Sequence, residues 1–236
     1  MKLGVSAIGW EAQDNTKIVC SLPKNIEFLE VVPANRTGLF TKDLQIYSAQ
    51  SLFWGVPAEN FDDDLRVAPH FQWLLEASER LGLRRLVLGS PGLRKGSIKG
   101  LLNTLKDFDQ DFCSIGTTIC IEPVARQYGG DYFFTVDEIA QSLKRWKFKA
   151  VKTMIDTNSI WMEGQCPATV LHDHFDYIDH VHISDKNIGP IVNTKDHINF
   201  ASALKSSGYS QAVVRELLRA NDCPAEYHLF SSIYGS

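Results

Sequence analysis

Carboxylate and imidazole side chains end four consecutive apolar runs in the second half of the sequence. They are Glu122, Asp156, His182 and Glu216. Three carboxylates and one imidazole could surround a single divalent cation if the fold brings the four run ends together. Oxygen-rich ligation with one histidine suits Mn²⁺, Mg²⁺ or Co²⁺ better than a closed structural zinc site, and Zn²⁺ with open positions is an alternative.

Residue spacing within each run predicts which side chains can converge. In an extended strand successive side chains point to opposite faces, so residues two apart share a face. The candidates and their neighbours on the same face are Cys120 with Glu122, Met154 with Asp156, His180 with His182 and Ser184, and Val214 with Glu216. A lone carboxylate at a strand end is more often a helix cap or an ion-pair partner, but four candidates on successive strands favour a metal site.

The elements that must position these residues are short runs, rich in apolar and β-branched residues, each of which ends at a polar residue. Eight such runs are recognisable, over 3–8, 26–32, 46–53, 85–89, 117–122, 151–156, 178–183 and 212–216. Helices are expected between several of them, over 65–81, 98–113, 135–146, 167–176 and from a cap at Asn199 to a stop at Gly208. Thr135 and Glu138 form a capping box, and Gly82 is a helix stop.

Alternation of strands and helices predicts parallel pairing through right-handed crossovers. Eight β/α units in 236 residues fit an α/β fold, one closed (β/α)8 TIM barrel, better than an open sheet of six or seven strands. A single domain is expected over 1–236. Its second β/α unit is shortened, because the segment 33–44 leaves room for a short helix or none.

Composition narrows the classes of partner. The 24 Lys and Arg against 28 Asp and Glu give a formal charge of -4, so there is no wide positive field, and nucleic acid is not the expected partner. No apolar stretch approaches the length of a membrane span. The five cysteines are odd in number and scattered, which is typical of free thiols in a reducing compartment. A cytoplasmic protein is expected.

The eight runs together resemble the xylose isomerase-like TIM barrel family, and especially its sugar-phosphate isomerase/epimerase branch. The resemblance covers nearly the whole chain and rests on the order and spacing of several short motifs. They are LGVSAIGW (3–10), IEFLEVVP (26–33), SAQSLFWG (48–55), RLVLGSP (85–91), IEP (121–123), MIDT (154–157), HVHISD (180–185) and VVRE (213–216).

The resemblance implies roles for the four strand-end residues. It makes Glu122, Asp156, His182 and Glu216 ligands of a divalent metal, and it makes Glu122 and Glu216 acid/base groups on opposite faces of a carbohydrate substrate. A metal bound to a ketose carbonyl would acidify the adjacent C–H, and the two carboxylates would move the proton through an enediolate. The implied activity is that of a sugar, or sugar-like, isomerase or epimerase. Relatives of this barrel often pair, so a homodimer is also an expectation.

The sequence departs from the family where relatives contact substrate. Relatives commonly carry a glutamate, a histidine and an arginine at positions that here are Tyr128, Ser159 and Ile188. The metal ligands are therefore expected to be retained and the substrate contacts replaced. The residues expected to contact substrate are Gln50, Trp54, Tyr128, Asn158, His180 and Lys186.

Several of these residues also have a structural interpretation. Gln50 could be an ordinary polar residue of the barrel mouth, Trp54 a loop aromatic packed on its neighbours, and His180 a buried core histidine. Glu30 could reach the mouth or pair with Arg36. Two other functions remain alternatives: a metal-dependent hydrolase or lyase on the same barrel, and a catalytically silent ligand-binding relative.

Overall fold

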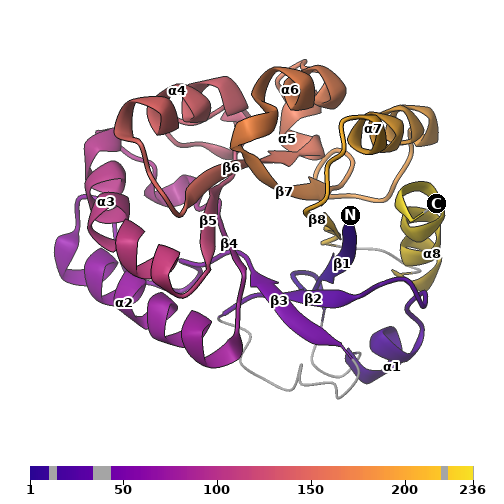
Figure 1. The fold of residues 1–236 in the computed structure, drawn as a ribbon, viewed down its shortest axis with the longest axis horizontal. Coiled ribbons are helices and arrows are strands. Elements are labelled where there is room, and N and C mark those ends of the chain that lie inside the picture. The colour runs from indigo at the N-terminus through magenta and orange to yellow at the C-terminus, as the bar shows by residue number, and fades with distance from the viewer. Residues whose placement is uncertain (11–14, 34–43, 219–222, 236) are drawn as a thin grey trace.

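Eight parallel strands close into a barrel in the computed structural model, which describes residues 1–10, 15–33, 44–218 and 223–235 (Figure 1). The strands follow chain order, and the last pairs with the first. They are β1 (Lys2–Ser6), β2 (Phe28–Val31), β3 (Gln45–Ala49), β4 (Arg85–Leu88), β5 (Thr118–Ile121), β6 (Val151–Asp156), β7 (Ile178–Ile183) and β8 (Ala212–Arg215). The predicted (β/α)8 barrel is confirmed.

Helices surround the strands (Figure 1). They are α1 (Asn15–Cys20), α2 (Asp64–Leu81), α3 (Ile98–Ser114), α4 (Val136–Trp146), α5 (Thr157–Met162), α6 (Pro167–His174), α7 (Thr194–Ser206) and α8 (Cys223–Tyr234). Single 3-10 turns η1 (Pro91–Leu93), η2 (Arg126–Tyr128) and η3 (Phe175–Tyr177) lie in the loops. Most of the predicted short unit at 33–44 falls outside the described residues.

The local signals act as expected at several helix ends. The Thr135 hydroxyl accepts the backbone N–H of Glu138 at the start of α4, and this satisfies one of the amides that a helix leaves unpaired. Gly82 ends α2 in the left-handed conformation, at φ 67°, which glycine adopts without a steric penalty.

One helix begins earlier than predicted, and three helices were not predicted. Helix α7 begins at Thr194, five residues before the expected cap at Asn199, because the backbone amides of Asp196 and His197 already bond to the Asn193 carbonyl. The buried His197 occupies a core-facing position there, and this polar residue interrupts the apolar pattern. Helices α1, α5 and α8 were not predicted, and α5 follows β6 without a loop.

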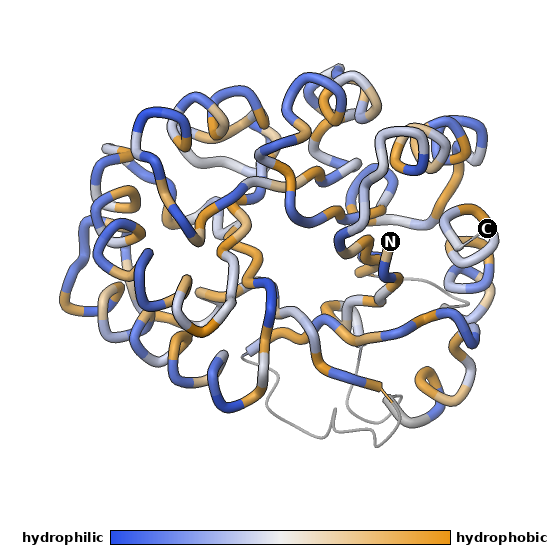
Figure 2. The backbone as a smooth tube through the Cα atoms, in the orientation of Figure 1, coloured by the Kyte–Doolittle hydropathy of each residue, from blue (hydrophilic) through white to orange (hydrophobic). Residues whose placement is uncertain are grey.

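The apolar core has two layers. Larger clusters fill the space between strands and helices, where the inner helix sides are apolar (Figure 2). Two small clusters fill the barrel lumen: one is Val87, Cys120 and Met154, and the other is Phe28, Tyr47, Ala212 and Val214. Because side chains alternate along a strand, the residues two positions beyond several of these also point into the lumen. They include Glu30, Glu122, Asp156 and Glu216.

Among the described residues, no helix combines the length and the apolar character that a bilayer span requires.

Candidate active site

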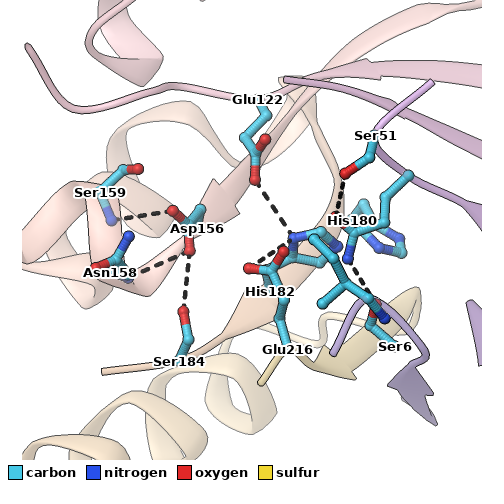
Figure 3. Close-up of polar contacts among 12 residues, drawn as sticks. Ser6, Ser51, Glu122, Asp156, Asn158, Ser159, His180, His182, Ser184 and Glu216 are labelled. Atoms are coloured by element: carbon cyan, nitrogen blue, oxygen red, sulfur yellow. Dashed lines mark hydrogen bonds and ion pairs between the residues drawn. The ribbon is translucent and has the colours of Figure 1, made fainter. Parts of the chain in front are cut away.

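Three of the four expected metal ligands meet at the C-terminal mouth of the barrel. Glu122 directly follows β5, His182 lies in β7 and Glu216 directly follows β8. One ligand atom from each lies within 4.8 Å of the others. Figure 3 shows the two carboxylates approaching the His182 ring from two sides. The convergence follows from parallel pairing, since all eight strands end at the same rim.

The Nδ1 atom of His182 is the centre of this group. It lies 3.4 Å from Glu122 Oε1 and 3.6 Å from Glu216 Oε2, and neither contact has the geometry of a hydrogen bond. Within the described residues this buried nitrogen has no hydrogen-bond partner. One unpaired imidazole nitrogen and the two carboxylates beside it together form a set of ligand atoms that fits a divalent cation.

Burial changes the protonation of the site. It raises the pKa of Glu216 from 4.5 to about 8, against the charge of His182 and with the help of the Glu122 and Asp156 charges. It also raises the pKa of Asp156 from 3.8 to about 6, together with the Glu122 charge. For His182, burial opposes the charged ring, but the charges of Glu30 and Glu216 raise its pKa well above 6.5. Like charges in a desolvated space repel one another strongly. They lie close together only when a proton or a cation offsets one of the charges.

Asp156 lies beside the three residues but has a second task. Its carboxylate accepts the backbone amides of Asn158, at 3.3 Å, and Ser159, at 3.0 Å, and thereby caps α5 (Figure 3). Ser184 Oγ also donates to it at 3.4 Å. Asp156 is outside the compact group of Glu122, His182 and Glu216, so its role as a fourth ligand stays a prediction.

Glu30, weighed in the sequence only as a mouth residue or a partner of Arg36, is part of the site. The carboxylate is buried, with Oε1 2.8 Å from His182 Nε2 and Oε2 2.9 Å from His180 Nε2. Arg36 lies outside the described residues. The signal that could have identified Glu30 is an acidic residue on the same face as Phe28 in an apolar run.

A pocket of about 230 Å³ opens above these residues. Its lining is Ile8, Gln50, Ser51, Gly89, Ser90, Pro91, Glu122, Val124, Tyr128, Asp156, Asn158, Ser159, Ile188 and Glu216. Ser159 and Ile188, two of the departures from the family pattern, are thus at the pocket wall. So is Tyr128, whose hydroxyl accepts Asn158 Nδ2 at 3.2 Å.

The six residues expected to contact substrate divide into three groups. Gln50, Tyr128 and Asn158 line the pocket. His180 is buried against Glu30, beneath it. Trp54 and Lys186 line two neighbouring hollows instead, and their contact with substrate stays a prediction.

Backbone strain collects around the pocket. Ser51, Ser90 and Ile188 line it and have φ of 52°, 48° and 54°, in the left-handed region that non-glycine residues rarely adopt. Such conformations cost about 1–3 kcal/mol each and persist where the surrounding structure imposes them, often at functional sites.

Each of the two glutamates has a buried arginine behind it. Arg94 donates to the carbonyls of Leu88 and Glu122, both at 2.8 Å, and of Phe133 at 3.1 Å. Arg215 donates to the carbonyls of Ile183, Glu216 and Gly189 and to the Glu226 carboxylate. Neither arginine was identified from the sequence, because both act on backbone carbonyls.

Several solved structures share this fold. They include a 3-keto-D-glucoside 4-epimerase from E. coli (TM-score 0.76, 19% identity, 100% of both chains covered). A D-allulose 3-epimerase from Methylomonas sp. in complex with D-allulose gives TM-score 0.75 at 16% identity, over 99% of this chain and 97% of that one. A D-psicose 3-epimerase from Clostridium cellulolyticum H10 with D-tagatose gives 0.74 at 15%, over 100% and 92%.

Sequence comparison assigns the family. A search of curated proteins gives no significant match. The family model described as "Xylose isomerase-like TIM barrel" matches residues 35–228, which is most of the chain. The chain therefore belongs to the xylose isomerase-like TIM barrel family.

Proposed function

We propose that this protein is a metal-dependent isomerase or epimerase of a sugar or sugar-like polyol, with Glu122 and Glu216 as paired acid/base groups. The observation that carries the proposal is the His182 ring between these two carboxylates, 3.4 Å and 3.6 Å from Nδ1, at the base of a pocket. The fold likeness to structures named as sugar epimerases supports the same reaction class.

The residues that would hold the metal are Glu122, His182 and Glu216, with Asp156 at their side. They fit a divalent cation because their donor set is oxygen-rich and the buried His182 Nδ1 is unpaired among the described residues. Mn²⁺, Mg²⁺ and Co²⁺ suit this set, and Zn²⁺ with open positions suits it as well. When bound, the ion would polarise a ketose carbonyl and acidify the neighbouring C–H.

The chain's own residues would move the proton. Glu122 and Glu216 approach from β5 and β8 and both line the pocket, so a substrate carbon bound at the base of the pocket would face a carboxylate on either side. One carboxylate takes the proton and leaves an enediolate, and the other returns a proton to the opposite face or to the adjacent carbon. Burial excludes competing water, since the side chains are only 16% and 5% exposed.

The pocket wall sets the limit on the substrate. Tyr128, Ser159 and Ile188 stand where relatives commonly carry a glutamate, a histidine and an arginine, and all three line the pocket. The substrate class is therefore a polyol in which a carbonyl lies next to a hydroxyl-bearing carbon, and no individual sugar is assigned.

Deuterium exchange tests the proposal. Purified protein loaded with Mn²⁺ or Co²⁺ is incubated in D₂O with a panel of ketoses and keto-glycosides, and NMR follows deuterium at the carbon beside the carbonyl. We expect exchange with at least one compound, and we expect Glu216→Gln to slow it by about 10²-fold or more, because general acid/base catalysis is worth that much.

The matched control is Glu76→Gln. Glu76 is an exposed glutamate of α2 whose carboxylate accepts the Gln72 side-chain amide. The variant should exchange at the wild-type rate. Full exchange by Glu216→Gln, or full exchange after removal of the metal with EDTA, would contradict the proposed mechanism.

A further inference from the structure

The carboxylate of Glu30 is enclosed in the barrel lumen with no access to solvent. Each of its oxygens has two polar neighbours. Oε1 lies 2.8 Å from His182 Nε2 and accepts Gln50 Nε2 at 3.2 Å. Oε2 lies 2.9 Å from His180 Nε2 and accepts Ser48 Oγ at 2.8 Å. An ionised carboxylate has about four lone-pair positions, so this group uses its full capacity.

A shift in strand register accompanies this arrangement. Between β2 and β3 the pairing changes from Leu29 with Ile46 to Glu30 with Ser48, so that one residue of β3 is passed over. A bulge of this kind redirects side chains. Here Glu30 and Ser48 are opposite one another and bonded, and the carboxylate reaches across the lumen to β7.

The two histidines have no alternative polar partner for these nitrogens. Among the described residues neither His180 nor His182 has an aligned hydrogen bond on its ring, and both are fully buried. Their edge-to-face contact, with ring centroids 5.0 Å apart, also fixes the two planes relative to each other. The Glu30 contacts are therefore what determines which nitrogen of His182 faces the pocket.

The buried carboxylate of Glu30 is surrounded by polar groups that can offset its charge. They are the two imidazoles, the Ser48 hydroxyl and the Gln50 amide. A buried carboxylate without such partners would be strongly unfavourable. The Glu30 carboxylate thus lies at contact distance from Nε2 of each ring and is the acceptor available to both nitrogens.

We propose that Glu30 is a positioning residue of the active site: it orients His182 so that Nε2–H points to β2 and Nδ1 points between Glu122 and Glu216. The inference rests on the proposed function, since Nδ1 is the nitrogen that would bind the metal. Acceptors on the far nitrogen of a ligating histidine fix its tautomer and raise its basicity, and their loss costs about 10–100-fold in metal affinity.

The test compares Glu30→Gln with Glu27→Gln. The amide of the first variant can accept from only one ring, because its other end is a donor. Glu27 directly precedes the same strand but is exposed at the other end of the barrel, where it accepts the Leu3 amide. Calorimetric titration of the metal-free proteins with Mn²⁺ and Co²⁺ should show about 10–100-fold weaker binding for Glu30→Gln and wild-type binding for Glu27→Gln.

A second measurement separates positioning from general support of the fold. The visible absorption spectrum of the Co²⁺-loaded protein should change in Glu30→Gln, because the ring orientation changes, and a purely structural role would lower the thermal stability without altering that spectrum. If Glu30→Gln does not fold, Ser48→Ala removes one contact of the carboxylate and should weaken Co²⁺ binding by a smaller factor in the same direction.

The outcomes are distinct. Unchanged Mn²⁺ and Co²⁺ affinity in Glu30→Gln would overturn the inference, and so would two bound ions per wild-type chain with one lost in the variant, since Glu30 would then be a ligand. If the wild-type protein binds neither ion, the proposed function fails, and ¹⁵N NMR of the metal-free protein decides the inference. Protected Nε2–H signals of His180 and His182 that shift in Glu30→Gln would support it, and their absence would overturn it.

Discussion

On both the β5 and the β8 side of the site, a buried arginine binds the backbone carbonyl of the glutamate, but the two arginines have different partners. Behind Glu122, Arg94 donates to three backbone carbonyls and, among the described residues, to no carboxylate. Behind Glu216, Arg215 donates to three carbonyls and also to Glu226, at 3.0 Å. Burial lowers the pKa of Arg94 to about 10, against the charge of Glu122.

The two glutamates also differ in burial, and the β8 residue is the more buried. The Glu122 side chain is 16% exposed and that of Glu216 is 5% exposed. On the β8 side, Glu226 connects Arg215 to α8 and also accepts the Ile191 amide. The backbone carbonyl of Glu216 is thus bound by an arginine that is paired with a carboxylate of α8. The backbone carbonyl of Glu122 is bound by an arginine that donates to carbonyls alone among the described residues. The comparison predicts different consequences for matched substitutions.

The largest expected effect is on stability, from Arg215→Met. The substitution leaves Glu226 without its partner and the carbonyls around it unpaired, so we expect a loss of about 3–5 kcal/mol in the free energy of unfolding. Arg94→Met removes only contacts to carbonyls and should cost about 1–3 kcal/mol. Urea denaturation of the metal-free variants measures both, and equal losses would show that the Glu226 network adds nothing.

The next effect is a pH dependence of stability that arises at the β8 glutamate. The folded-state pKa of Glu216 is raised from 4.5 to about 8. Its contribution to wild-type stability is therefore complete below about pH 4.5 and is lost as the pH rises through 8. Metal-free Glu216→Gln should match or fall below the wild type at pH 4.5 and exceed it in melting temperature at pH 9.

Glu122→Gln is the comparison for that experiment. Because Glu122 is more exposed, its neutralisation should give a smaller gain at pH 9. With saturating Mn²⁺ the wild type should have a higher melting temperature than either variant, since the ion needs the charged carboxylates. A gain of equal size for the two variants would contradict the difference in burial.

The smallest effect concerns the space beside Glu122. A Cβ at Gly89 would lie 2.2 Å from Glu122 Oε2, so Gly89→Ala must displace the carboxylate. Gly92, in the same loop, has no atom within 4 Å of such a Cβ. We expect Gly89→Ala to reduce Mn²⁺ affinity and turnover by about tenfold or more with little change in stability, and Gly92→Ala to leave both unchanged. Equal Mn²⁺ affinity and turnover in Gly89→Ala and Gly92→Ala would show that the space beside Glu122 does not limit its position.

The repeated strands and their polar ends could be predicted because they are local. Apolar β-branched runs specify strands, chain order specifies parallel neighbours, and period-two alternation then points Glu122, His182 and Glu216 into one lumen. The register shifts could not be predicted, because nothing in the runs marks where one residue is passed over. One shift lies between Thr153 and Met154 in the β6–β7 pair, and it sets the register in which Asp156 lies opposite His182.

The sequence by itself determined the barrel and the set of residues at its mouth, because each depends on pattern along one segment. Only the tertiary structure decided how those residues are used. Glu30 reaches His180 and His182 across the lumen, Asp156 caps α5, and Arg94 and Arg215 clamp carbonyls of other strands. The physical reason is that these contacts join segments far apart in the chain, so each depends on closure of the barrel and on side-chain rotamers that no single segment specifies.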